Sequence, residues 1–214
     1  MADTYRTLAT PARADLKVVD SRFIAEAFPV DSEEAAEAQI AAIRKREHKA
    51  THHCTAYRVG RAGDTFRYND DGEPSGTAGP PILRQIDARE LTNTLVVVTR
   101  YFGGTKLGTG GLVRAYGDAA AAVLEAARIV ERVERVPVRI RFAYDDTTPA
   151  RQTLRRFDAE IEDEAYSDVT ELTVAVRRSE AEAFVRAFTD ALGGRGEILG
   201  MRERENGGKG ANSL

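Results

Sequence analysis

Cysteine, long apolar runs and excess positive charge are all scarce in this sequence of 214 residues. The single cysteine, Cys54, cannot form an internal disulfide or supply the thiolates of a zinc or iron–sulfur centre, which favours a reducing compartment. No stretch approaches the roughly 20 apolar residues of a membrane-spanning helix, and the charged N-terminus argues against a secretion signal. We therefore expect a cytoplasmic protein with no membrane partner.

The charge balance excludes a protein that coats nucleic acid through bulk positive charge, because the formal net charge is −3. No DNA-specific signal is present, although a local basic patch remains possible. With 42% hydrophobic and 30% charged residues, the chain can bury an ordinary core beneath a polar surface. We expect it to fold.

The pattern along the chain predicts two α+β domains between two loose ends. Residues 1–14 show no periodicity and are predicted to form a flexible leader, whereas residues 204–214 are rich in glycine and are predicted to form a disordered tail. The first domain spans residues 15–134. The second spans residues 135–203, where alternating and helical patterns follow the order βαββαβ of a ferredoxin-like domain.

Within the first domain, residues 16–30 predict a strand pair, and a helix follows with Asp31 as its N-cap. The apolar run Leu95–Thr99 is typical of a central strand buried on both faces. Residues 112–130 repeat apolar side chains at helical spacing and predict a long buried helix. Between these elements, residues 70–81 contain so many glycines and prolines that we predict a loop.

A glycine loop lies between the central strand and the long helix, with five glycines in the nine residues 103–111. Glycine lets backbone N–H groups approach a ligand, and the start of a helix adds unpaired donors and positive potential, which suit phosphate. The loop fails the Walker pattern and resembles the phosphate loop of galactokinase-type kinases only over a short stretch; a tight structural turn is the alternative. The predicted anion-binding residues are Arg100, Gly103, Gly104, Lys106, Gly108, Gly110, Gly111 and Arg114.

The acidic loop that follows Asn69 is the second candidate, because Asp70, Asp71 and Glu73 offer the hard oxygen ligands that divalent cations prefer. Three acids do not complete a coordination shell, so turn-stabilising hydrogen bonds are the alternative. We expect no cofactor, and Mg²⁺ only together with a bound phosphate. The residues predicted to line a cleft beside the glycine loop are His53, Asp70, Asp71, Glu73, Ser75, Thr77 and Tyr101.

Two further groups of residues carry side chains suited to chemistry or binding, residues 52–54 and Arg139 with Arg141. On a strand His52 and Cys54 share a face while His53 points the other way, so they cannot meet one metal ion. Cys54 is interpreted as buried packing. In the second domain Arg139 and Arg141 could touch RNA, but pairing with acids across the strands, such as Glu171, is favoured.

Four segments closely resemble the YigZ/IMPACT family: Ser21–Ala25, His53–Tyr57, Asp70–Gly79 and Thr99–Gly117. The resemblance covers about residues 15 to 130, and the remainder resembles the C-terminal domain of the bacterial members. It implies a first domain similar to the second domain of ribosomal protein S5, joined to a ferredoxin-like domain similar to one in elongation factor G. Eukaryotic members regulate translation with an additional N-terminal domain, which we do not find here.

These observations favour a binding protein linked to translation, whose partner is RNA, the ribosome, a nucleotide or a phosphorylated partner. The alternative is a Mg²⁺-dependent enzyme of nucleotide or phosphoryl chemistry. No residue stands where the sequence alone identifies a catalytic base, so the catalytic residues of such an enzyme stay unknown. We therefore expect binding rather than catalysis.

Overall fold

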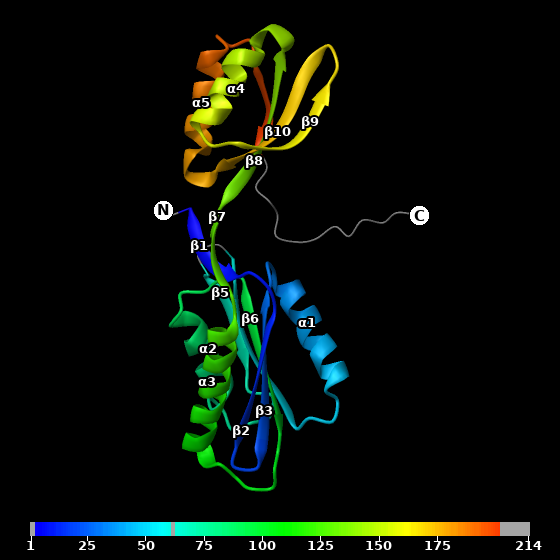
Figure 1. Ribbon diagram of the computed structural model, residues 1–214, viewed down its shortest axis with the longest axis vertical. Coiled ribbons are helices and arrows are strands. Elements are labelled where there is room, and N and C mark those ends of the chain that lie inside the picture. Colours follow the sequence, from blue (N-terminus) through cyan, green and yellow to red (C-terminus); the bar gives the residue numbers. More distant parts are fainter. Residues whose placement is uncertain (1–2, 61–62, 202–214) are drawn as a thin grey trace, which may run out of the picture. The chain divides into compact units, whose positions relative to one another are not determined.

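The computed structural model describes residues 3–60 and 63–201, which form two compact units (Figure 1). The N-terminal unit comprises residues 5–132. The C-terminal unit runs from Val133 onward and includes Asp3 and Thr4. The division falls two residues before the predicted boundary, and the tail predicted over residues 204–214 lies outside the described residues.

The N-terminal unit is built on a five-stranded antiparallel sheet with the order β2-β3-β6-β4-β5. Its strands are β2 (Ala12–Val18), β3 (Ser21–Pro29), β4 (His52–Val59), β5 (Thr65–Asn69) and β6 (Thr94–Tyr101). β6 occupies the centre, and its residues from Thr94 to Arg100 are all buried. The apolar run therefore predicted the central strand correctly, because a strand with helices on both faces has no polar side to alternate.

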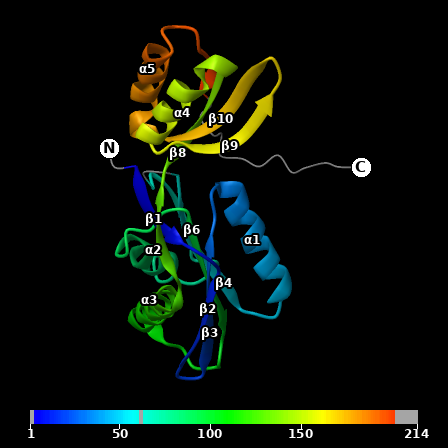
Figure 2. The same ribbon diagram turned by 45° about the horizontal axis from the view of Figure 1, so that its top comes forward.

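Helices cover both faces of this sheet (Figures 1 and 2). α1 (Glu33–Arg46) packs Ile40 and Ile43 on one face, against Tyr57 and Leu95. α2 (Gly79–Asp87) and α3 (Gly108–Ala126) cover the other face with a larger apolar cluster. Among the described residues no helix is both long and apolar enough to cross a membrane.

Residues 3–14, the described part of the predicted leader over residues 1–14, are not flexible. β1 (Thr4–Leu8) pairs with β7 (Ile129–Val133), and β2 already begins at Ala12. Leu8 is fully buried, and the Arg6 carbonyl accepts a hydrogen bond from the Thr92 N–H at 3.0 Å. The segment lacks an obvious pattern because its partners lie far away in the sequence.

Two helix starts also differ from expectation. The N-cap of α1 is Ser32 rather than Asp31, because the Ser32 hydroxyl accepts the Ala35 N–H at 3.1 Å. Within the predicted loop, α2 begins at Gly79 with Pro80 and Pro81 in its first turn. Proline is tolerated there because the first N–H groups of a helix have no intrahelical acceptor.

The C-terminal unit confirms the predicted βαββαβ order in an antiparallel sheet ordered β11-β8-β10-β9. Its elements are β8 (Arg135–Ala143), α4 (Thr147–Arg156), β9 (Glu160–Tyr166), β10 (Val169–Arg177), α5 (Ala181–Ala191) and β11 (Glu197–Met201), with short 3₁₀ turns at Tyr144–Asp146 and Arg178–Glu180. Glu171 pairs with Arg141 at 2.6 Å and with Arg139 at 3.8 Å. The prediction that these arginines pair with acids across the strands is confirmed.

Candidate functional site

A buried ion pair joins the acidic loop to the end of β6. Arg100 Nη1 donates to Glu73 Oε1 at 2.6 Å, and both side chains are about 5% exposed or less. The Tyr116 hydroxyl, from α3, donates to the same oxygen at 2.7 Å. The predicted role of Arg100 as a phosphate ligand is therefore wrong for this structure, because its charge is already neutralised inside the unit.

Ser21 ties this pair to the glycine loop. Its hydroxyl oxygen accepts Arg100 Nη2 at 3.2 Å and the Gly103 N–H at 3.3 Å. The Arg100 guanidinium also lies 5.4 Å from the ring centroids of Phe23 and Phe102, within cation–π range. The start of the glycine loop is thus fixed by buried contacts.

Asp70 and Asp71 stabilise the acidic loop rather than project from it. Asp70 Oδ1 accepts the N–H groups of Ala78 at 2.9 Å and Gly79 at 2.8 Å, and its Oδ2 accepts the Gly76 N–H at 2.8 Å. Asp71 accepts the backbone N–H of His53 and a guanidinium N–H of Arg44, both at 2.6 Å. Asp70 therefore caps α2 across the loop, as the turn-stabilising alternative predicted.

The remaining loop residues fit this arrangement. Thr77 is buried, and its hydroxyl donates to the Pro74 carbonyl at 2.6 Å, whereas Ser75 is exposed. In residues 3–60 and 63–201, no three His, Cys, Asp or Glu side chains are grouped as a metal-ion site. The three acids of the loop instead bind donors of the protein itself.

His53 and Tyr101 lie on the opposite face of the sheet from Glu73, so the predicted cleft residues do not line one cleft. The His53 ring bonds the Glu47 carbonyl through Nε2 at 3.2 Å, and the Tyr101 hydroxyl donates to the Glu47 carboxylate at 2.8 Å. Burial lowers the pKa of His53, opposed by the nearby charge of Asp71. The β4–β6 register explains the division, since His53 pairs with Thr99 and neighbouring residues on a strand face opposite sides.

Cys54 has the packing role predicted for it. Its side chain is fully buried, and the thiol donates to the Asp70 carbonyl at 3.0 Å. Burial raises the pKa of the thiol well above its ordinary value. A protonated, enclosed thiol is a poor nucleophile.

The exposed part of the predicted anion site is the glycine-loop surface, which we define as residues 103–111 with Arg114. Gly104, Lys106, Gly108, Gly110 and Arg114 are exposed, and Gly111 is half-buried. α3 begins at Gly108, and its N-cap residue, Leu107, makes no side-chain capping bond within the described residues. Arg114 follows Gly110 by four residues, so the two share one side of the helix. In the described part of the chain, neither Lys106 nor Arg114 has an ion-pair partner.

Close packing requires glycine at the start of this surface. A Cβ added at Gly103 would lie 2.0 Å from the Asp20 carbonyl oxygen, in the turn between β2 and β3. The Thr105 hydroxyl also donates to the Asp20 carboxylate at 3.1 Å. The structural-turn alternative thus holds for Gly103, while the residues after Thr105 stay on the surface.

Ser21 and Tyr116 were absent from the predicted site, although both connect its parts. Both stand inside the segments that carried the family resemblance, and this was the available signal. Their contacts join residues 79 and 43 positions apart, which no local pattern reveals.

Comparison with known proteins identifies the family of this chain. The sequence profile described as "Impact N-terminal domain" matches residues 19–124, and one described as "Domain of unknown function (DUF1949)" matches residues 140–195. The IMPACT family member YvyE of Bacillus subtilis is 37% identical over 92% of this chain and 91% of its own length. The IMPACT family member YigZ of Escherichia coli is 32% identical over 91% of this chain and 97% of its own length.

A solved structure agrees with these matches. It is titled "Crystal structure of an hypothetical protein", is 30% identical, and covers 96% of this chain and 100% of its own with a TM-score of 0.69. The chain belongs to the IMPACT family.

Proposed function

We propose that the chain is a binding protein linked to translation that holds RNA phosphates on the glycine-loop surface. The observation that carries this proposal is the exposed start of α3 beside Lys106 and Arg114, two cations that have no acidic partner in the described part of the chain. The first N–H groups of a helix lack intrahelical acceptors, and the helix dipole adds positive potential there. Backbone phosphate supplies the matching charge.

Phe102 supports single-stranded RNA as the partner. Its ring is 45% exposed directly before the glycine-loop surface, and the Arg100 guanidinium contacts it from the interior. Proteins that bind single strands combine cations that follow the backbone with aromatic rings on which bases stack. An exposed surface also suits an extended strand better than a free nucleotide, which usually occupies an enclosed pocket.

The acids of the neighbouring loop favour binding over catalysis. Asp70 caps α2, Asp71 holds Arg44, and Glu73 neutralises Arg100. A general base needs an oxygen directed at the substrate, and a metal ligand needs an oxygen directed at the metal ion. The Mg²⁺-dependent enzyme therefore has less support than the binding protein.

The assignment of each domain to a known fold is part of the same proposal. The βαββαβ order and the sheet order β11-β8-β10-β9 support a ferredoxin-like C-terminal domain. The N-terminal sheet, with α1 on one face and α2 and α3 on the other, fits the resemblance to the second domain of ribosomal protein S5. Ribosomal protein S5 and elongation factor G, whose domains these resemble, both work on the ribosome. A cytoplasmic location follows from the same proposal.

Fluorescence anisotropy with a labelled single-stranded RNA, titrated at several salt concentrations, tests the proposal. We expect Lys106→Gln and Arg114→Gln each to weaken binding and to reduce the steepness of log K against log [salt] by about 0.7. Phe102→Leu should weaken binding with little change in slope. Lys45→Gln, an exposed lysine on α1, is the matched control. Curves for the Lys106 and Arg114 variants that coincide with wild type at every salt concentration contradict the proposal.

A further inference from the structure

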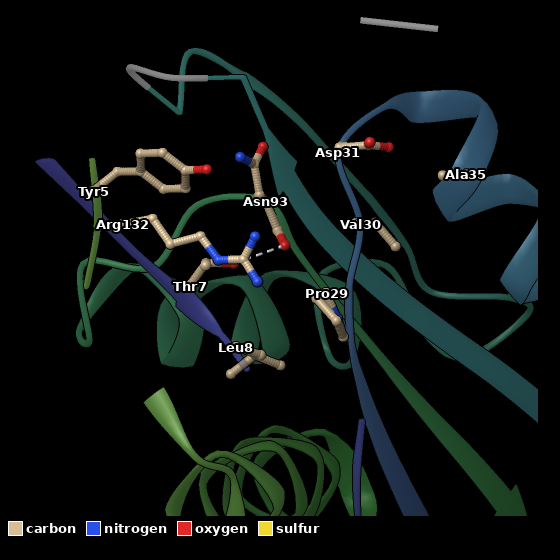
Figure 3. Close-up of a pocket in the computed structure, with 9 residues that line it drawn as sticks. All are labelled: Tyr5, Thr7, Leu8, Pro29, Val30, Asp31, Ala35, Asn93 and Arg132. Carbon is tan, nitrogen blue, oxygen red and sulfur yellow. Dashed lines mark hydrogen bonds between the residues drawn. The ribbon is translucent and has the colours of Figure 1, made fainter. Parts of the chain in front are cut away.

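A second site lies at the other end of α3. The glycine-loop surface precedes this helix and Arg132 follows it (Figure 1), and 19 residues of helix span about 28 Å. Beside the exposed Arg132, an open pocket of about 260 Å³ lies between β1 and the end of β3 (Figure 3). All the residues that line it belong to the N-terminal unit.

The pocket wall around Asn93 is built by specific contacts. Asn93 adopts a left-handed backbone conformation with φ of 52°. Its carbonyl accepts the Val30 N–H at 2.9 Å and the Thr7 hydroxyl at 3.1 Å, and its side-chain oxygen accepts the Gly60 N–H at 3.1 Å. With both oxygens occupied, the side-chain nitrogen of Asn93 remains as a donor.

Donors gather on one side of the pocket. Tyr5, Asn93 and Arg132 all line the pocket, and Figure 3 draws their side chains on the side away from Asp31 and Ala35. Arg132 has no ion-pair partner within residues 3–60 and 63–201. A guanidinium beside an amide N–H and a phenol matches the planar oxygens of a carboxylate.

The rest of the wall limits the body of the ligand. Leu8, Pro29 and Val30 contribute apolar surface, and Leu8 is fully buried. Asp31 lies on the far side, beside Ala35, so a second negative group would meet a like charge there (Figure 3). At about 30 Å³ for each water, the volume suits a ligand of roughly eight to ten non-hydrogen atoms.

We propose that this pocket binds a small monocarboxylate with an apolar body, whose carboxylate contacts Arg132, Asn93 and Tyr5. The site is independent of the proposed RNA surface. Either can fail without the other, because each has its own residues and its own assay.

Chemical-shift titration of the ¹⁵N-labelled full chain with 4-methylpentanoate and with phenylacetate tests the proposal. We expect saturable shifts at the amides of Leu8, Val30 and Asn93, and no such shifts with the matched neutral amides 4-methylpentanamide and phenylacetamide. Arg132→Gln should weaken carboxylate binding at least tenfold because the charge partner is lost. Ala35→Leu, which fills the pocket from α1 and leaves Arg132 in place, should abolish it. Arg186→Gln, an exposed arginine on α5, is the matched control.

The proposal is overturned by any of three results: neither carboxylate produces saturable shifts at these amides, the neutral amides bind as well as the acids, or Arg132→Gln binds as tightly as wild type. Binding of glutarate or inorganic phosphate as tight as that of 4-methylpentanoate also overturns it. Asp31 would then not disfavour a second negative group, or the apolar wall would not favour an apolar ligand. If Arg132→Gln alters the spectrum throughout the N-terminal unit, the Ala35→Leu variant replaces it as the test. Carboxylate binding that persists in Ala35→Leu then overturns the proposal.

Discussion

The side chain of Glu73 organises more of the N-terminal unit than any exposed residue of the predicted site. One oxygen accepts hydrogen bonds from Arg100 on β6 and from Tyr116 on α3, and His52 Nε2 lies 3.8 Å away. Removing two charges from water carries a large desolvation cost, which a buried pair offsets only with good geometry and further hydrogen bonds. Glu73 meets that condition and fixes the acidic loop against the sheet.

Breaking the pair should therefore destabilise the fold strongly. We expect Glu73→Ala to lower the free energy of unfolding by about 3–5 kcal/mol, because it leaves the Arg100 guanidinium buried without a counter-charge. Tyr116→Phe, which removes only a hydrogen bond, should cost about 1–3 kcal/mol. Urea unfolding of both variants measures the difference. Equal losses of unfolding free energy in the two variants would show that the Glu73–Arg100 charge pair contributes no more than the Tyr116 hydrogen bond.

The lowered pKa of His53 predicts how the free energy of unfolding depends on pH. Burial lowers its pKa in the folded state below the unfolded value of 6.5. As pH falls below about 6.5 the unfolded chain gains a proton that the folded chain does not, so stability is lost from that point downward, at no more than about 1.4 kcal/mol per pH unit. Urea unfolding between pH 7.5 and 5.5 should show this loss, and His53→Gln should remove most of it. A His53→Gln profile as steep as that of wild type would assign the loss elsewhere.

At the scale of single residues, the sequence indicated the correct neighbourhood but assigned Arg100 the wrong environment. Val96, Val98 and Arg100 alternate along β6 on the face that packs against α2 and α3, so strand periodicity alone points Arg100 inward. Its counter-charge comes from Glu73, which is 27 positions earlier. Contacts over such a separation leave no periodic signal, and the arginine was interpreted as a surface cation.

At the scale of elements, α2 shows why the interior loop was predicted too long. Gly79, Pro80 and Pro81 resemble a helix break, yet they form the first turn of α2. The missing cap comes from Asp70, eight and nine residues before the amides that it accepts, rather than from the position before the helix. By contrast, α1 and α3 carry their apolar spacing locally, and both were predicted, although the helix predicted to residue 130 ends at Ala126 and residues 129–130 belong to β7.

The cap predicts a graded response to substitution at Asp70. Asp70→Ala should cost about 1–2 kcal/mol, at the upper end for a lost cap, because three loop amides lose their acceptor. Asp70→Asn keeps one side-chain oxygen and should cost less. Hydrogen exchange at the amides of Gly76, Ala78 and Gly79 measures the effect directly. Unchanged protection at these three amides in Asp70→Ala would exclude the capping role.

At the scale of the whole molecule, no hydrophobic cluster of the described residues is shared between the two units. In the N-terminal unit Ile82 and its neighbours on α2 and α3 pack against the sheet, and in the C-terminal unit Phe184 and Phe188 pack against β8 and β10. Each core is complete within its own unit. Unfolding should therefore not follow a single two-state transition.

Core substitutions should distinguish the two transitions. Phe188→Ala should lower the stability of the C-terminal unit by about 3–5 kcal/mol, and Ile82→Ala that of the N-terminal unit by about 2–5 kcal/mol. Differential scanning calorimetry of the two variants should shift different transitions. A single transition that moves as one in both variants would show that the units unfold together.

The assignment of Asp3 and Thr4 to the C-terminal unit means that, within residues 3–60 and 63–201, the polypeptide passes between the units once after Thr4 and once after Arg132. A protease that cuts after Arg132 therefore separates the fragment from Val133 onward from Asp3 and Thr4, which stay covalently attached to the N-terminal unit. A fragment that starts at Val133 also lacks Asp3, whose carboxylate accepts the Ser179 N–H at 2.9 Å. Dissection of the chain into working halves therefore requires that residues 3–4 stay with the second half, for example by joining them to Val133 through a short linker.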